Sequence, residues 1–564
     1  MKRIFLFCTA LLLFLAFTSC KRNAVVELSA DDLKDKIMGG MVGQILGNIN
    51  GLPYEETYNK EPGNMKYKPS LPYGAFTDDD TDIEWVYIYY MDKEKKPLLS
   101  YDTIRQMWLK HLYYAIYSSN AYGRELMALG IEPPLTGNIY VNPWSRLNVA
   151  GQFNCETFAL AAPGMCRSSE EIAMHYTSVI VDQEPLQSTQ LFAAMIARAF
   201  VSNDLDDILN TGLEAMDQNS ITYTAVQDAL AWHKQYPNDW KATRNEIRKK
   251  YYFVNDPLKC VFNTAAIIAQ YQYGKGDFVK TFEIAFNWGF DADCNAATLG
   301  TIIGAMKGYK WFEQQGWNIR DRYCNTTRPG LPTDETITSF SERIARIAEQ
   351  VILLNDGTID TAGGKKIYRI KTQPSECLLQ LKNEEQIFAD LRFKYEKSVE
   401  STIRDSSNAA QLAKAAYLSL CLKTCEELKS RYPAKWQKAL YALQQYNELL
   451  YFIDHAVESP VKKLAANMDI HVVNPQPGLS GNTEFKLKGY PDAKSVLLGG
   501  TMNGWESWKT PMQKTDDGWM CKIDLDHGKY EYKFIVDGQT IFDPDNTLQE
   551  TNCEGRTNSI VIVP

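Results

Sequence analysis

Two short acidic segments, more than two hundred residues apart, place carboxylates closer together than stability alone would favour. The first is Asp78-Asp79-Asp80-Thr81-Asp82, and the second is Gly289-Phe290-Asp291-Ala292-Asp293-Cys294-Asn295. Like charges at short range repel and raise one another's pKa. A bound divalent cation removes that penalty, because carboxylate, hydroxyl and amide oxygens are the ligands of hard cations such as Mg²⁺ and Ca²⁺. The pair predicts an oxygen-lined metal site assembled from two distant parts of the chain.

Two simpler interpretations of these segments are a calcium-binding loop and helix capping. An EF-hand loop that starts at Asp78 needs glycine at its sixth position and glutamate at its twelfth, where Ile83 and Tyr89 stand. Acidic caps are favourable at helix starts, here near Ile83 and just before a helix expected over residues 296–306. One aspartate is enough for a cap, so the clustering favours a ligand role.

Glycines recur at every fourth position in two stretches that lie next to carboxylates: Glu55 and Glu56 follow the first, and Asp291 and Asp293 precede the second. The two ladders are Gly39, Gly43, Gly47 and Gly51, and Gly300, Gly304 and Gly308. A glycine in a helix interior costs about 1 kcal/mol relative to alanine, so a ladder of them needs a reason. Polar residues such as Gln44 and Asn48 argue against a membrane helix. We therefore expect two buried helices whose backbones approach closely and bring the acidic groups together.

The composition is typical of a folded protein, and the length indicates more than one domain. The chain has 564 residues, of which 45% are hydrophobic and 23% charged, and a formal net charge of -9. This acidic balance argues against a nucleic-acid partner. The chain has only six histidines, which are scattered, and no Cys-x-x-Cys pair, so zinc is not expected. The pairing of the cysteines stays open.

Residues 1–20 have the pattern of a targeting segment. Lys2 and Arg3 precede an apolar run that ends at Phe17 and is followed by Thr18-Ser19-Cys20. Small residues before a cysteine resemble the signal of bacterial lipoproteins, which implies cleavage before Cys20 and a lipid on its sulfur. This predicts a lipoprotein anchored in the bacterial cell envelope, facing the periplasm or the outer membrane. An ordinary cleaved secretion signal is the alternative.

Hydrophobic periodicity divides the rest of the chain. Residues 28–355 show mainly helical spacing and residues 365–470 form a helical extension, which a short strand pair within residues 365–381 could introduce. A Pro- and Gly-rich linker covers residues 471–483. Residues 484–564 alternate as short strands between turns, which predicts a small all-β module.

Three blocks together resemble the ADP-ribosylglycohydrolase family. They are the glycine-rich block from Gly39 to Glu55, the triplet Asp79-Asp80-Thr81, and the block from Gly289 to Asn295. The resemblance implies an orthogonal α-helical bundle that holds one or two Mg²⁺ ions, with Ca²⁺ or Mn²⁺ as alternatives. In that family the metals hold the vicinal hydroxyls of a ribose while water cleaves the bond at its anomeric carbon.

The resemblance also assigns roles to single residues. It implies six metal ligands: Asp78, Asp79, Asp80, Asp291, Asp293 and Cys294. Asp78 stands where the family has a threonine, unless Thr77 keeps that role, and Cys294 replaces a serine or threonine. Glu55 and Asp80 are the expected catalytic carboxylates, with Glu55 as a general base or a group that orients water. Glu55 could instead be a surface residue. The residues expected on the substrate side are Asn48, Gln152 and Asn295.

The C-terminal module resembles the glycogen-binding modules of AMP-activated kinase β-subunits. The segments from Leu498 to Trp505, from Gly528 to Gly538 and at Asp543-Pro544 carry the likeness. It implies an immunoglobulin-like β-sandwich whose sugar contacts are Trp505, Lys533 and Asn558. The family's second stacking tryptophan falls on Thr540, so Trp508 could substitute for it. A sandwich that binds no sugar is the alternative.

These expectations combine into an exported, metal-dependent glycoside hydrolase of the ADP-ribosylglycohydrolase type. It would cleave an anomeric bond of a glycan or glycoconjugate, furanosides included. True ADP-ribosyl hydrolysis is a second possibility. A non-catalytic, carbohydrate-binding lipoprotein is a third, favoured if Cys294 abolishes a metal site.

Overall fold

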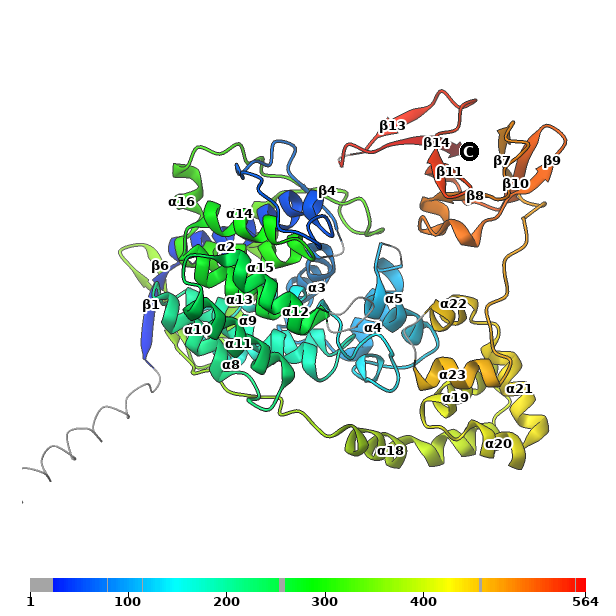
Figure 1. Ribbon diagram of the computed structural model, residues 1–564, viewed down its shortest axis with the longest axis horizontal. Coiled ribbons are helices and arrows are strands. Elements are labelled where there is room, and N and C mark those ends of the chain that lie inside the picture. Colours follow the sequence, from blue (N-terminus) through cyan, green and yellow to red (C-terminus); the bar gives the residue numbers. More distant parts are fainter. Residues whose placement is uncertain (1–23, 79, 114, 253–258, 456–458, 553) are drawn as a thin grey trace, which may run out of the picture.

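A computed structural model describes residues 24–564 except 79, 114, 253–258, 456–458 and 553. A large helical bundle is followed by a smaller helical extension and a C-terminal β domain (Figure 1). The predicted fold, a helical bundle with a separate β domain, is confirmed. The expected targeting segment and lipidation site Cys20, like the expected ligand Asp79, lie outside the described residues. Among the described helices, none combines the length and apolar character needed to cross a membrane.

The bundle is built around two antiparallel helices, α2 (Ala30–Gly51) and α15 (Ala292–Lys307). Their glycines face each other at successive turns. A Cβ on Gly43 would lie 2.0 Å from the carbonyl oxygen of Gly300, and one on Gly39 would lie 2.5 Å from that of Gly304. Only glycine permits this approach, so the predicted close contact of two buried helices is confirmed.

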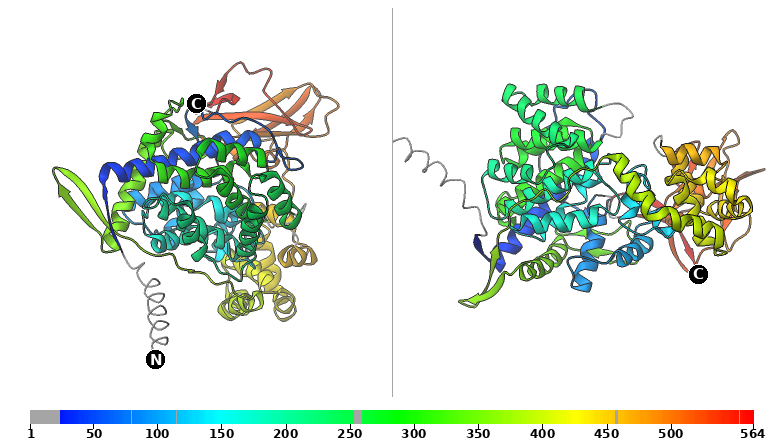
Figure 2. Two further views of the ribbon diagram at one scale, coloured as in Figure 1. Left: turned by 60° about the vertical axis from the view of Figure 1, so that its left-hand side comes forward. Right: turned by 90° about the horizontal axis from the view of Figure 1, so that it is seen from below.

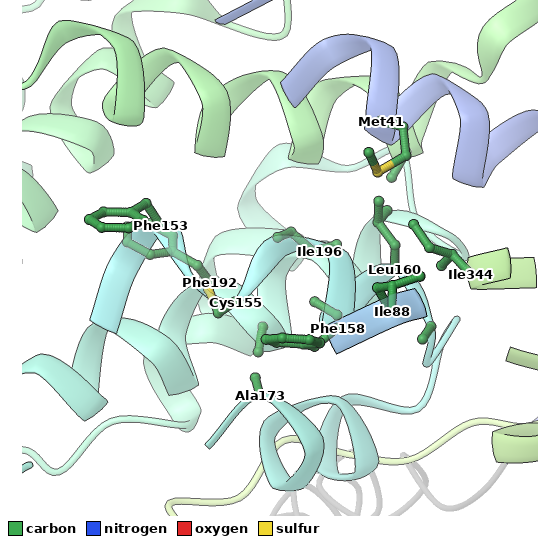
Figure 3. Close-up of a cluster of buried hydrophobic side chains, with 14 of the residues drawn as sticks. Met41, Ile88, Phe153, Cys155, Phe158, Leu160, Ala173, Phe192, Ile196 and Ile344 are labelled. Atoms are coloured by element: carbon green, nitrogen blue, oxygen red, sulfur yellow. The ribbon is translucent and has the colours of Figure 1, made fainter. Parts of the chain in front are cut away.

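The remaining bundle helices pack against this pair or against one another, and Figure 2 shows the bundle from two further sides. They are α3 (Thr81–Glu94), α4 (Tyr101–His111), α5 (Ser118–Ala128), α6 (Ala150–Phe153), α7 (Glu156–Leu160), α8 (Cys166–Thr177), α9 (Glu184–Ala199), α10 (Leu205–Glu214), α11 (Ile221–Gln235), α12 (Trp240–Tyr251), α13 (Lys259–Gly274), α14 (Phe278–Trp288), α16 (Tyr309–Gln314) and α17 (Ile337–Leu354). Figure 3 shows part of the core beneath α2, where Met41, Leu160 and Ile344 pack together. Burial of such side chains supplies most of the stabilisation of helices like these.

Two small sheets complete the bundle. In one, β1 (Val25–Ser29) pairs antiparallel with β6 (Lys365–Lys371), which pairs with β5 (Thr358–Ala362). Strand β6 therefore pairs with the first strand of the bundle, whereas its sequence position predicts the start of the helical extension. In the other, β2 (Ala75–Phe76) runs parallel to β3 (Tyr323–Cys324), which pairs with β4 (Asp334–Glu335). This second sheet brings the loop that begins at residue 77 next to the loop that begins at residue 325.

The helical extension has its own core but shares it with the bundle. Its helices are α18 (Glu384–Asp405), α19 (Ala409–Cys421), α20 (Cys425–Arg431), α21 (Pro433–Leu443), α22 (Asn447–His455) and α23 (Pro460–Asn467). Trp436 and Leu443 are buried together with Leu126 of α5. The hydroxyls of Tyr122 and Tyr417 are hydrogen-bonded at 2.8 Å. These contacts fix the extension against the α5 side of the bundle.

The β domain contains two antiparallel sheets over one core. The first joins β7 (Thr483–Lys488), β10 (Gly518–Ile523) and β9 (Gln513–Thr515), and the second joins β8 (Val496–Gly500), β11 (Gly528–Val536), β12 (Gln539–Ile541), β14 (Thr557–Val563) and β13 (Gln549–Thr551). Phe485, Leu498 and Phe534 fill the space between the sheets. Alternating buried and exposed residues in β7 place its apolar face on this core.

Candidate functional site

The first acidic segment lies between strand β2 and helix α3, and Asp80 is the residue just before that helix. Asp80 is buried. The side-chain amide of Asn48, from the C-terminal part of α2, donates to Asp80 Oδ2 at 2.6 Å and to Asp78 Oδ2 at 3.2 Å. Asn48 therefore orients two carboxylates.

Asp82 has a different role from its neighbours. Its Oδ2 pairs with the Arg328 guanidinium at 2.6 Å and accepts a hydrogen bond from Thr327 Oγ1 at 2.7 Å. Both charged side chains are fully buried. Burial raises the pKa of Asp82 to about 6, against the opposing effect of Arg328. This ion pair fixes the start of α3 to the loop after β3.

Thr77 strengthens the same junction. Its hydroxyl oxygen accepts hydrogen bonds from the backbone N–H groups of Thr326, at 2.7 Å, and Thr327, at 3.1 Å. The hydroxyl is thus engaged with the neighbouring loop. This arrangement favours Asp78, the alternative candidate, for the ligand position that the family gives to threonine.

A strained turn directs the second acidic segment. Gly289 and Phe290 have φ values of 76° and 59°, and a Cβ on Gly289 would lie 2.7 Å from the backbone of Tyr58. The Phe290 N–H donates to Asn59 Oδ1 at 2.8 Å, and buried Arg244 donates to the carbonyl oxygen of Trp288 at 2.8 Å. These contacts hold the turn so that helix α15 begins with Asp291 and Asp293 on the side of α2.

The glycine at the end of α2 brings the two segments together. A Cβ on Gly51 would lie 2.4 Å from the Cα of Asp293. Carboxylate oxygens of Glu55, Asp291 and Asp293 all lie within 4.8 Å of one another. Asp80, Asp293 and the sulfur of Cys294 form a second group within the same limit. Asp293 thus belongs to two clusters of ionisable groups.

The electrostatics of these clusters favour a cation. Asp291 Oδ2 and Asp293 Oδ1 are buried and have no hydrogen-bond partner among the described residues. Burial and neighbouring carboxylates raise the pKa of Asp293 well above its usual range. Burial, followed by Asp291 and Asp78, raises the pKa of Glu55 to about 7. Unpartnered carboxylate oxygens that converge in this way fit a hard divalent ion.

Cys294 contributes as a hydrogen-bond donor in this arrangement. Its Sγ donates to Asp80 Oδ1 at 3.2 Å. Burial and the surrounding aspartates raise the pKa of the thiol well above its usual range. Sulfur is a less favourable ligand than oxygen for a hard cation. Cys294 stays a predicted ligand, and in this structure it also holds Asp80 in position.

The two clusters open into a cavity of about 190 Å³. Glu55, Asp80, Asp291 and Asp293 form its acidic part, and an aromatic wall faces them, composed of Tyr117, Phe153, Tyr251, Tyr252, Phe262 and Phe290. The rings of Phe262 and Phe290 meet edge to face at 4.6 Å, and Tyr252 packs against both. The cavity therefore combines a cluster of carboxylates with aromatic side chains.

Comparison with known proteins decides the family of this bundle. Residues 29–352, more than half of the chain, match the profile of the ADP-ribosylglycohydrolase family. The chain belongs to that family. Its acidic cavity lies where residues from the matched segment converge, between the end of α2 and the start of α15.

The C-terminal module has relatives of its own. Residues 482–564 match the glycogen recognition site of AMP-activated protein kinase. The human 5'-AMP-activated protein kinase subunit beta-1 is 32% identical over 114 residues, which are 20% of this chain and 40% of that protein. The mouse beta-2 subunit is 36% identical over 70 residues, 12% of this chain and 25% of that protein. The match thus covers less than half the length of these relatives and concerns the module alone.

Not every residue expected on the substrate side lines the ADP-ribosylglycohydrolase cavity. Gln152 and Asn295 are fully buried behind its wall, where the Gln152 amide donates to Asn295 Oδ1 at 3.2 Å. Asn295 in turn donates to Asn263 Oδ1 at 3.1 Å, and Asn263 lines the cavity. Because neighbouring helices cover both side chains, they orient Asn263 instead of contacting a ligand. Asn48 likewise orients carboxylates of the site, those of Asp78 and Asp80, by hydrogen bonds from its side-chain amide.

Sequence reasoning missed several polar residues of this cavity, and two of them, Lys259 and Asn263, lie close to the acidic part. Both lie on α13, one turn apart, and Lys259 lowers the pKa of Asp291 and Glu55 against the larger effect of burial. The only sequence feature that could have indicated Lys259 is a basic residue at the start of an otherwise apolar helix. Without the packing of α13 against α15, nothing in the sequence connects it to the acidic segments.

The three expected sugar contacts of the β module do come together. Trp505, Lys533 and Asn558 line one cavity of about 720 Å³, which Thr540 also lines. Trp508, the expected substitute for the missing tryptophan, lines the same cavity. Its ring stacks on Tyr451 of α22 at 4.2 Å and 4°, so one of its two faces is covered by the helical extension.

Proposed function

We propose that this chain is a metal-dependent glycoside hydrolase that cleaves an anomeric bond of a glycan or glycoconjugate. Membership of the ADP-ribosylglycohydrolase family supports hydrolysis. The observation that carries the proposal is the pair of clusters that share Asp293 in an acidic cavity. Such a concentration of buried carboxylates is unfavourable without a cation and useful with one.

The residues that would hold a cation are Asp80, Asp291 and Asp293, joined by Asp78 and by Asp79, which lies outside the described residues. When bound, one or two Mg²⁺ ions, or Ca²⁺ or Mn²⁺ in their place, supply a Lewis acid that orients a cis-diol and acidifies a water molecule. Asn48 and Cys294 hold Asp80 in position by donating to its two oxygens.

The chain's own side chains supply the rest of the chemistry. In hydrolysis, the oxygen of water bonds to the anomeric carbon, the glycosidic C–O bond breaks, and the leaving oxygen gains a proton. Glu55, at the rim of the acidic cluster, is placed to orient that water and accept its proton. The transition state develops positive charge at the anomeric carbon, which the surrounding carboxylates stabilise.

The β module supports a carbohydrate substrate, because its match is a glycogen recognition site. Residues 1–20 support export and a lipid anchor at Cys20, which would place the enzyme in a bacterial cell envelope. One observation favours a second function, the hydrolysis of ADP-ribosyl groups. The aromatic side chains of Tyr117 and Tyr252 line the cavity and would suit a nucleobase as readily as a sugar.

A substrate panel tests the proposal. The purified chain is assayed with Mg²⁺ on furanosides, glucans, and ADP-ribosyl-arginine and ADP-ribosyl-serine compounds. We expect release of sugar from a glycoside, lost with EDTA and lowered by about 100-fold or more in Asp293→Asn. Asp356→Asn, at an exposed carboxylate outside the cavity, is the matched control and should keep full activity. Hydrolysis of ADP-ribosyl compounds alone would support the second function, and activity that survives EDTA would refute a metal role.

A further inference from the structure

The larger cavity lies between three parts of the chain. Tyr117, Thr326 and Thr327 line it from the bundle, Tyr451 from α22 of the extension, and Trp505 and Lys533 from the β module. Its volume of about 720 Å³ is in the range of roughly 300–1,000 Å³ typical of ligand sites. In Figure 1 the β domain lies beside both the bundle and α22. The sugar-binding face expected of the module therefore faces the rest of the protein.

Specific contacts hold the module in this orientation. On the bundle side, Thr326 Oγ1 donates a hydrogen bond to Glu554. On the extension side, the Lys509 ammonium pairs with Glu448 at 2.9 Å, next to the stacked rings of Trp508 and Tyr451. Contacts with two different partners fix both the position and the rotation of the module.

The lining has the chemistry of a sugar site. Trp505 stands at a φ of 61°, and its side chain, with that of Lys533, lines the cavity. The Asn558 amide donates to Glu531 Oε2 at 2.5 Å, and both side chains line the same wall. An aromatic face suits the apolar side of a pyranose ring, while charged and amide groups bind its hydroxyls. Arg556 and Glu554 add a donor and an acceptor.

This cavity adjoins the acidic one. Tyr117 and Ser118, at the start of α5, line both cavities. Tyr117 is 61% exposed, so its side chain borders open space at the point where the two cavities meet.

We infer that the two cavities form one composite cleft for an α-glucan oligosaccharide of a few rings. The β module acts as a set of distal subsites that place one end of the chain in the acidic cavity, with Tyr117 as the bridging contact. The inference that the oligosaccharide binds depends only on the lining of the larger cavity. The inference that the bound oligosaccharide is cleaved depends on the proposed function. An independent module would bind the same sugar without any help from the bundle.

Calorimetry with maltoheptaose tests the composite cleft. The full-length chain is titrated in EDTA, so that binding is measured without hydrolysis. We expect Trp505→Ala and Tyr117→Ala each to weaken binding by about tenfold or more, because each removes an aromatic contact. Tyr117→Phe keeps the ring and should keep the affinity. Phe393→Ala, at a ring that is 91% exposed on α18, is the matched control and should bind like the unchanged chain.

The outcomes separate this inference from the proposed function. Loss of binding in Trp505→Ala with no change in Tyr117→Ala would show an independent module and overturn the composite cleft. Absence of maltoheptaose binding to the unchanged chain would also overturn it. Binding that needs both rings, in a chain that hydrolyses no glycoside of the panel, would uphold the cleft and reject the proposed function.

Discussion

Replacing Gly43 by alanine should separate the two central helices and destabilise the bundle. The new Cβ would lie 2.0 Å from the carbonyl oxygen of Gly300, an atom that cannot rotate away. Non-bonded carbon and oxygen atoms normally stay more than 3 Å apart, so α2 and α15 must separate by about 1 Å or more. This separation also loosens the neighbouring contact of Gly47 with Ala296. Overpacking of this kind costs about 3 kcal/mol. The higher helix propensity of alanine offsets about 1 kcal/mol of this cost, so the free energy of unfolding falls by about 2 kcal/mol.

Thermal unfolding measures this loss directly. A loss of this size lowers Tm by about 3 °C in a domain of the bundle's length. Gly123→Ala on α5 is the matched control, because there the new Cβ would meet a methyl group of Ile180 at 3.1 Å, which a small side-chain shift relieves. We expect its Tm to stay near that of the unchanged chain. The reasoning fails if Gly43→Ala melts at the same temperature as the unchanged chain.

The same substitution should also affect the metal site, since α15 begins with Asp291 and Asp293. Added Mg²⁺ should raise the Tm of the unchanged chain by mass action. In Gly43→Ala the rise should be smaller, because the carboxylates of Asp293 and Asp80 are no longer held at the same separation. An undiminished rise would show that the site does not depend on the helix contact.

Three further predictions concern buried charges and domain contacts. Arg328→Met should lower the free energy of unfolding, measured with denaturant, by about 3–5 kcal/mol, because Asp82 stays buried without its ion-pair partner. Adding Asp82→Asn to that variant should restore part of the loss. Burial raises the pKa of Glu170 to about 8 from its usual 4.5, so the unfolded chain ionises first and stability falls as pH rises from about 4.5 to 8. The Tm difference between pH 5 and pH 8 should shrink in Glu170→Gln, and an unchanged difference would contradict this assignment. Trp508→Ala removes the stack on Tyr451, worth about 1 kcal/mol, and should speed proteolytic cleavage in residues 471–483, whereas equal cleavage rates would show that the stack does not hold the module.

Regular sequence patterns predicted the parts of the site that depend on local rules. The four-residue spacing of Gly39, Gly43 and Gly47 has one physical use in a buried helix, which is close approach of a second backbone. The position of that second helix followed from a matching ladder at Gly300. Because Glu55 follows the first ladder and Asp293 lies just before the second, the close approach of these two carboxylates followed as well.

The contacts that sequence could not reveal are single pairings between distant residues. The ion pair of Asp82 with Arg328 joins positions 246 residues apart, and no periodicity marks either of them. Asp82 therefore looked like one more ligand candidate. In the same way, only the fold shows that Tyr451 stacks on one face of Trp508. Domain orientation, which creates the larger cavity, has no sequence signature at all.

The central claim is that a divalent cation binds between the two acidic segments. Crystals of the full-length chain soaked in Mn²⁺ test it most directly, because manganese gives an anomalous signal that water does not. The account predicts an anomalous peak about 2.1–2.2 Å from carboxylate oxygens of Asp291 and Asp293, on the side of Asp80 or of Glu55. Ordered carboxylates at saturating Mn²⁺ with no peak between them would contradict it.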